Sequence, residues 1–150
     1  MGDLKTEAYK LCDAFIRARI ETAKTALEQS REASNNDTKS SAGDKFETTR
    51  EMMAQDIGRT KGLLADAEQN LQVLEAIADV PAAERVRSGN LVSTNQGIFF
   101  ISISAGLLNT GSNKIFSISA LSPVGKMMIG KKINESFNFN GNEYKINSIE

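Results

Sequence analysis

The sequence predicts an α+β protein in which an antiparallel two-helix coiled coil precedes a small domain with an antiparallel sheet and one short helix. Two segments, 4–33 and 44–80, lack proline and repeat small or apolar residues every seven positions, as paired helices do. From Asn90 onward the pattern changes to the alternation typical of strands. Pro81 disfavours helix in the residue before it, so we expect two domains, at 1–80 and 86–150.

The first predicted helix covers 4–33, a segment without glycine that is rich in residues favouring helix. Two interleaved series mark the face that it should bury. The first series is Ile16, Ala23 and Ser30, and the second is Ile20, Leu27 and Ser34. The following segment, 34–43, is rich in serine and asparagine, which predicts a connecting turn.

The second predicted helix begins near Asp44 and carries a matching seam. Its two series are Phe46, Met53, Thr60, Ala67 and Leu74, and Ile57, Leu64, Leu71 and Ala78. Gly58 and Gly62 weaken this helix by about 1 kcal/mol each relative to alanine. Two matched seams joined by a short polar connection predict an antiparallel pair, and assembly of several chains through the same seam is the alternative.

The second domain carries strand signals on both sides of a short helix. Residues 99–104 alternate as a strand with one apolar face, and 114–120 repeat the pattern. Asn140 and Gly141 predict a tight turn between the last two strands. Ser122 can cap the helix, Pro123 fits its first position and Gly130 can end it.

The charge of the chain limits the classes of partner. A net charge of −1 argues against general nucleic-acid coating. Residues 1–80 hold 11 Lys and Arg against 15 Asp and Glu, a balance of −4, whereas residues 81–150 hold 7 against 4, a balance of +3. An acidic arm joined to a basic head suggests two contact surfaces with different partners.

The rare residue types limit the chemistry and the compartment. Cys12 is the single cysteine, so an intrachain disulfide is excluded and a reducing compartment is the simple interpretation. The absence of histidine excludes Ser-His and Cys-His nucleophile pairs and imidazole metal sites, which leaves carboxylates as ligands for magnesium or manganese. Without a leader or a long apolar run, we expect a cytoplasmic protein that does not cross a membrane.

Asp44 and Glu47 are the candidate chemical site. They are three residues apart where the connection enters the second helix, so their carboxylates should lie on one side and could share a divalent cation or orient its water. A capping box, in which Asp44 caps the helix and Glu47 follows at the third position, is the structural alternative. The two interpretations are compatible. Asp37, in the same polar segment, is a weaker candidate.

Three features of the chain resemble the Gre family, the transcript-cleavage elongation factors of bacterial RNA polymerase. They are the acidic pair Asp44 and Glu47 at the tip of a helical hairpin, the segment 122–132 with its Ser-Pro and Gly-Lys steps, and the terminal hairpin at 135–149. The resemblance covers nearly the whole chain, and the carboxyl-terminal segment is its most specific part.

The resemblance implies an FKBP-like head that docks on the rim of the polymerase secondary channel, with the hairpin inside the channel. Asp44 and Glu47 would then help to hold the second Mg²⁺ of the polymerase and its attacking water, with only indirect contact to the nascent RNA. Matching positions imply docking or supporting roles for a set in the head: Ser122, Pro123, Lys126, Gly130 and Lys131. The resemblance further implies an accessory factor and not an enzyme, and we expect a monomer that binds no cofactor tightly by itself.

Two departures from the family pattern leave other functions open. The polar tip is longer than the family's compact turn, and Arg50 stands where a tyrosine commonly follows the acidic pair. These changes bear on cleavage more than on channel binding, so a secondary-channel regulator without cleavage activity is one alternative. A coiled-coil assembly module is another, and a proline isomerase is a more distant one.

Overall fold

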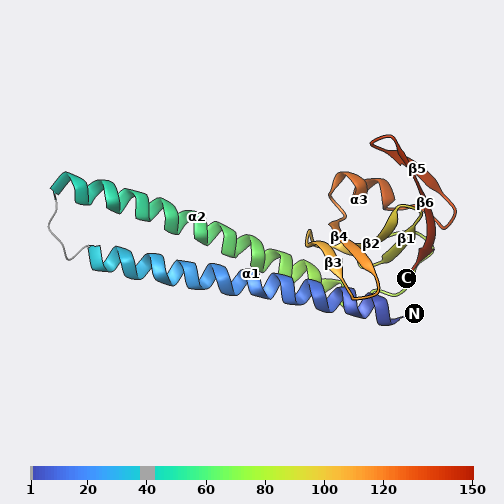
Figure 1. Ribbon diagram of the computed structural model, residues 1–150, viewed down its shortest axis with the longest axis horizontal. Helices are drawn as coiled ribbons and strands as arrows, with labels where there is room; N and C mark the ends of the chain where they lie inside the picture. Colours follow the sequence, from blue (N-terminus) through green and yellow to red (C-terminus); the bar gives the residue numbers. More distant parts are fainter. Residues whose placement is uncertain (1, 38–42) are drawn as a thin grey trace. The chain divides into compact units, whose positions relative to one another are not determined.

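The computed structural model describes the backbone of residues 2–37 and 43–150 and the side chains of residues 3–33 and 49–150. Two long helices, α1 (Gly2–Asp37) and α2 (Gly43–Ala76), come first. Six strands and one short helix, α3 (Pro123–Met128), follow. Figure 1 shows α1 and α2 side by side and running in opposite directions. The architecture is therefore α+β, as the sequence predicts.

Both helices begin or end at other residues than the sequence predicts. α1 continues through Asp37, so the first part of the predicted polar turn is helical, and the remainder of that turn, 38–42, lies outside the described residues. α2 begins at Gly43 and ends at Ala76, before the predicted end. A tighter turn follows, in which the Ile77 amide donates to the Leu74 carbonyl at 3.1 Å.

The predicted seam between the helices is confirmed over most of its length. On α1 the buried members are Ile16, Ile20, Ala23 and Leu27, and on α2 they are Thr60, Ala67 and Leu74. Four other members of the two α2 series are half-buried: Met53, Ile57, Leu64 and Leu71. Ala78 is exposed, contrary to the prediction, because α2 has already ended, and Ile77 is buried in its place. The side chains of Ser34 and Phe46 lie outside the described residues.

The chain forms two compact units. The hairpin unit is Ile16–Gln69, and the head unit combines Met1–Phe15 with Asn70–Glu150. The head unit therefore includes the first turns of α1 and the last turns of α2. Cys12 of α1 explains part of this division, because its sulfur lies 3.2 Å from the hydroxyl oxygen of Ser117 in the sheet.

The sheet contains six strands. They are β1 (Leu91–Thr94), β2 (Gly97–Ser102), β3 (Gly106–Asn109), β4 (Lys114–Ser119), β5 (Ser136–Phe139) and β6 (Asn142–Ile149), in the spatial order β3-β4-β2-β1-β6-β5. Four neighbouring pairs are antiparallel, and β2 and β4 are parallel, which the prediction of an antiparallel sheet did not include. The predicted turn between β5 and β6 is confirmed: Asn140 and Gly141 have φ values of 51° and 82° and connect the paired residues Phe139 and Asn142.

The two faces of β2 are both buried, so the prediction of one apolar face for this segment is wrong. Phe99 and Ile101 belong to the core cluster that also contains Met128 of α3. Phe100 and Ser102 point to the opposite face and are buried as well. The first turns of α1 cover this second face, where the Cys12 sulfur lies 3.7 Å from the Ser102 hydroxyl oxygen.

Candidate functional site

The N-terminus of α3 is fixed by the hydroxyl of Ser122. This oxygen accepts from the Gly125 amide at 3.1 Å and donates to the Ser119 carbonyl at 2.7 Å. Pro123 follows in the first turn, where its missing N–H costs no hydrogen bond. The predicted capping roles of Ser122 and Pro123 are therefore confirmed.

Gly125 allows α3 to lie close to the end of β4. A Cβ atom at this position would lie 2.1 Å from the Ser119 carbonyl oxygen. A side chain there would force the helix away from the strand. Gly125 thus positions the exposed residues of α3, including Lys126 and Met127.

Gly130 ends α3 as the sequence predicts and reverses the chain. Its φ is 86°, and its amide donates to the Val86 carbonyl at 2.9 Å. The Val86 amide in turn donates to the Lys131 carbonyl at 2.9 Å, and the Arg85 guanidinium donates to the Gly130 carbonyl at 2.9 Å. The segment before β1 therefore holds the C-terminal end of α3 in place.

An exposed apolar and basic surface surrounds α3, and we call it the α3 surface. It comprises the half-buried Lys131 and six exposed residues: Arg85, Leu121, Lys126, Met127, Ile129 and Ile133. Leu121 is 79% exposed, the highest value among the large apolar side chains that the structure describes. The predicted docking residues Lys126 and Lys131 belong to this surface, Pro123 is exposed beside it, and Ser122 and Gly130 are half-buried supports.

Sequence reasoning missed five members of the α3 surface: Arg85, Leu121, Met127, Ile129 and Ile133. Hydropathy alone does not separate the four apolar members from core residues. A signal existed for Leu121, because it precedes the capping residue Ser122 and therefore lies outside the helical turn. Arg85 gave no signal, since only the chain reversal at Gly130 brings its guanidinium to the end of α3.

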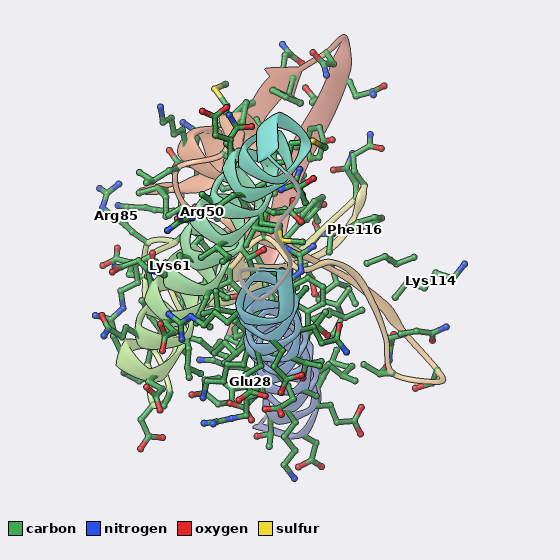
Figure 2. The ribbon with its side chains drawn as sticks, turned by 90° about the vertical axis from the view of Figure 1, so that its left-hand side faces the viewer. Glu28, Arg50, Lys61, Arg85, Lys114 and Phe116 are labelled. Atoms are coloured by element: carbon green, nitrogen blue, oxygen red, sulfur yellow. The ribbon has the colours of Figure 1, made fainter. Side chains whose placement is uncertain are left out.

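The acidic pair lies at the start of α2. Because α2 begins at Gly43, the backbone at positions 44 and 47 is helical and these positions share one face. The side chains of Asp44, Glu47 and the weaker candidate Asp37 lie outside the described residues, so their contacts stay predictions. Arg50, labelled in Figure 2, is exposed on α2 and makes no ion pair with a described residue.

A buried polar cluster joins α1 to the sheet and is distinct from both surfaces. Ser117 donates to the Ile103 carbonyl at 2.5 Å, and its oxygen lies 2.9 Å from that of Ser102. Burial raises the pKa of the Cys12 thiol, and hydrogen bonds from Ser117 and Ser102 oppose this effect. A protonated thiol in this position is a structural group with little nucleophilic character.

No protein-family model matches the chain, and no curated protein sequence matches it. Among the residues that the structure describes, no group of three or more acidic, cysteine or histidine side chains could hold a metal ion. In the same part of the chain, no helix combines the length and hydropathy needed to cross a membrane.

Proposed function

We propose that this chain is an accessory factor of bacterial RNA polymerase, which inserts its helical hairpin into the secondary channel and stimulates the polymerase's own cleavage of the transcript in backtracked complexes. One observation carries the proposal. α2 begins at Gly43, so Asp44 and Glu47 are the second and fifth residues of the helix, at the connected end of the hairpin. A narrow two-helix arm can bring a carboxylate pair into a channel that would not admit a globular domain.

The donor set of the acidic pair suits a shared magnesium ion. Mg²⁺ takes oxygen ligands in a near-octahedral arrangement and is commonly bound by only one or two carboxylates, with water and substrate oxygens completing the shell. Asp44 and Glu47 would hold the ion together with groups of the polymerase. When bound, such an ion supplies an activated water for phosphodiester hydrolysis. The nascent RNA would be contacted only indirectly, through this site.

The α3 surface supports docking of the head on the polymerase. Leu121 and Met127 offer apolar contact, and the ammonium groups of Lys126 and Lys131 make no ion pair with a described residue. An exposed apolar group surrounded by unpaired cations fits a partner surface that is apolar and acidic. Docking of the head would give the protein a second point of attachment to the polymerase.

Binding and cleavage can be tested separately. Adding wild-type protein to backtracked elongation complexes should shorten the transcript from its 3′ end. Lys126→Glu combined with Lys131→Glu should weaken binding to core polymerase about tenfold or more and reduce cleavage in proportion. Lys114→Glu, a charge reversal of an exposed lysine on β4, is the matched control. Equal polymerase binding by the docking variant and the control would contradict docking through the α3 surface.

Arg50 favours a second candidate function, regulation of transcription through the channel without cleavage. Arg50 lies one turn after Glu47 on α2 and has no described acidic partner. A guanidinium at that spacing can pair with a carboxylate and compete with a metal ion for it. One variant distinguishes the two functions. Arg50→Tyr should raise the rate of transcript cleavage if the Arg50 guanidinium suppresses cleavage. The rate should stay unchanged if Arg50 has no such effect.

A further inference from the structure

The strand β3 (Gly106–Asn109) forms one edge of the sheet and pairs on its inner side with β4. Natural edge strands are commonly protected by charged residues, proline or a bulge. β3 contains no charged residue and no proline, and its register with β4 is continuous. An extended chain can therefore add to this edge as a further strand.

Two residues of β3 direct their backbone groups toward the open edge. Just beyond the strand, the Thr110 amide donates to the carbonyl of the opposite residue, Asn113, at 3.0 Å. Hydrogen-bonded and non-hydrogen-bonded pairs alternate in an antiparallel ladder, so positions 108 and 106 are the ones that bond to β4. The amide and carbonyl groups of Leu107 and Asn109 therefore point away from β4, where an added strand can bind them.

The side chains beside this edge form an apolar row and a polar row on one face of the sheet. Leu107 is opposite Phe116, and these side chains are 52% and 40% exposed. Asn109 is opposite Lys114, and both are exposed. We call these four residues the β3 edge. Because opposite residues of paired strands lie side by side, a bound residue opposite Leu107 would extend the apolar row, and one opposite Asn109 would extend the polar row.

The polar row fits an acidic group. Lys114 makes no ion pair with a described residue, and Figure 2 shows its side chain projecting outward from the start of β4. The side-chain oxygen of Asn109 accepts from the Gly111 amide at 3.1 Å, which leaves the side-chain nitrogen of Asn109 as a donor. A carboxylate is the side-chain group that accepts hydrogen bonds and carries the charge opposite to that of lysine.

The other edge of the sheet, formed by β5, offers less to an added strand. Its exposed residues, Ser136 and Asn138, are polar and uncharged. Phe137 and Phe139 belong to or pack against the core cluster, and α3 contacts this strand. The β3 edge is therefore the side of the sheet that combines apolar and charged contacts with outward backbone groups.

We propose that β3 binds an extended segment of another protein as an additional antiparallel strand, and that this segment carries an acidic residue two positions before an apolar one. In that direction the acidic residue lies opposite Asn109, near Lys114, and the apolar residue lies opposite Leu107, near Phe116. Backbone hydrogen bonds supply affinity and the two rows supply sequence preference. A second copy of β3 would bring no acidic residue to Lys114, because β3 contains none.

A synthetic peptide tests this binding on the full-length chain. Fluorescence anisotropy with the labelled peptide Ser-Thr-Glu-Thr-Val-Thr-Ser should give a dissociation constant of about 10–300 μM. Exchanging its glutamate and valine keeps the composition but places valine near Lys114, so this peptide should bind at least about fivefold more weakly. Equal binding of the two peptides overturns the proposal. So does a free chain that binds neither peptide at about 1 mM, whether or not it associates with itself.

Methylation of the peptide backbone distinguishes strand addition from a contact of side chains alone. The amide of the peptide valine should face β3, and that of the central threonine should face away. N-methylation of the valine should therefore weaken binding at least about tenfold, because it removes a hydrogen bond and places a methyl group against the edge. N-methylation of the central threonine should change the affinity by less than about threefold. Equal effects of the two methyl groups overturn the pairing.

A charge reversal in the protein tests the polar row. Lys114→Glu should weaken binding of the glutamate peptide at least about fivefold and strengthen binding of a peptide with lysine in its place by a similar factor. The gained affinity also shows that the variant is folded. Lys145→Glu, at an exposed lysine on β6, is the matched control and should leave both affinities within about twofold. An unchanged preference in Lys114→Glu overturns the assignment. No polymerase is present, so these outcomes are independent of the proposed function.

Discussion

At the scale of single residues, the contacts that join α1 to the sheet come from small polar side chains. Cys12, Ser102 and Ser117 are all buried, and their sulfur and oxygen atoms lie within 3.7 Å of one another. The three residues are far apart in the sequence, so no sequence pattern predicts this cluster. Cys12 precedes the serines by 90 and 105 positions, and neither serine lies in a recognisable motif. Only the folded chain shows why these polar residues stand among apolar ones.

Replacing Ser117 with alanine should destabilise the protein by about 1–3 kcal/mol, because the change removes the hydroxyl that donates to the Ile103 carbonyl and meets Ser102 and Cys12. Urea unfolding followed by circular dichroism measures the free energy. Ser112→Ala, at an exposed serine, is the control and should change stability by less than about 0.5 kcal/mol. Equal effects of the two substitutions would show that the buried cluster contributes nothing specific.

The Cys12 thiol should make stability depend on pH above its ordinary pKa of 9.0. Burial raises the pKa of this thiol in the folded protein, so the unfolded chain loses the proton first as the pH rises. The favourable contribution is therefore complete below pH 9.0 and declines above it.

Comparison of the wild type with Cys12→Ala isolates this effect. The difference between their free energies of unfolding should shift against the wild type as the pH rises from 9.0 to about 11. The pKa of Lys5, which burial lowers, acts in the opposite direction but is common to both proteins and cancels in the difference. A difference that stays constant over this range would contradict a raised thiol pKa.

At the scale of elements, local patterns predicted the helices and turns better than the sheet. The seven-residue series identified the buried seam of α1 and α2, and the capping residues of α3 and the turn at Asn140 and Gly141 were identified from residue type. These features depend on neighbours in the sequence. β3 was missed because Gly106–Asn109 is a short strand with no alternation. The parallel pairing of β2 with β4 depends on the path of the chain, which no local pattern reports.

Gly58 and Gly62 weaken α2 without serving a contact that the structure shows. An added Cβ atom at either position would have nothing within 4 Å. Gly58→Ala and Gly62→Ala should therefore each stabilise the helix by about 0.5–1 kcal/mol, because alanine loses less backbone entropy on folding. Thermal unfolding of the full-length protein measures the gain.

The same thermal unfolding measurement on Gly125→Ala should show a loss of stability. Its added Cβ atom would lie 2.1 Å from the Ser119 carbonyl oxygen, so this substitution should lower the unfolding temperature. An increase of similar size for all three alanine substitutions would indicate that α3 can move away from β4 without cost.

At the scale of the whole molecule, the order of the elements, two long helices and then a sheet with one short helix, was predictable, and the composition of the α3 surface was only partly so. Residue type identified the supports Ser122 and Gly130, the exposed Lys126 and the half-buried Lys131. The exposed apolar members could not be separated from core residues by hydropathy, because burial depends on what covers each face. The role of the Asp44 and Glu47 carboxylates as ligands of a metal ion stays a prediction, which depends on the start of α2 at Gly43.

Transcript cleavage in backtracked complexes tests the central proposal most directly. Wild-type protein should accelerate cleavage, and Asp44→Ala combined with Glu47→Ala should reduce the stimulated rate by at least about a hundredfold, roughly 2.7 kcal/mol in barrier height, while polymerase binding is retained. Glu28→Ala combined with Glu32→Ala, two exposed acidic residues of α1, is the matched control and should leave the rate within about threefold of the wild type. Cleavage at the wild-type rate by the Asp44 and Glu47 variant would contradict the account.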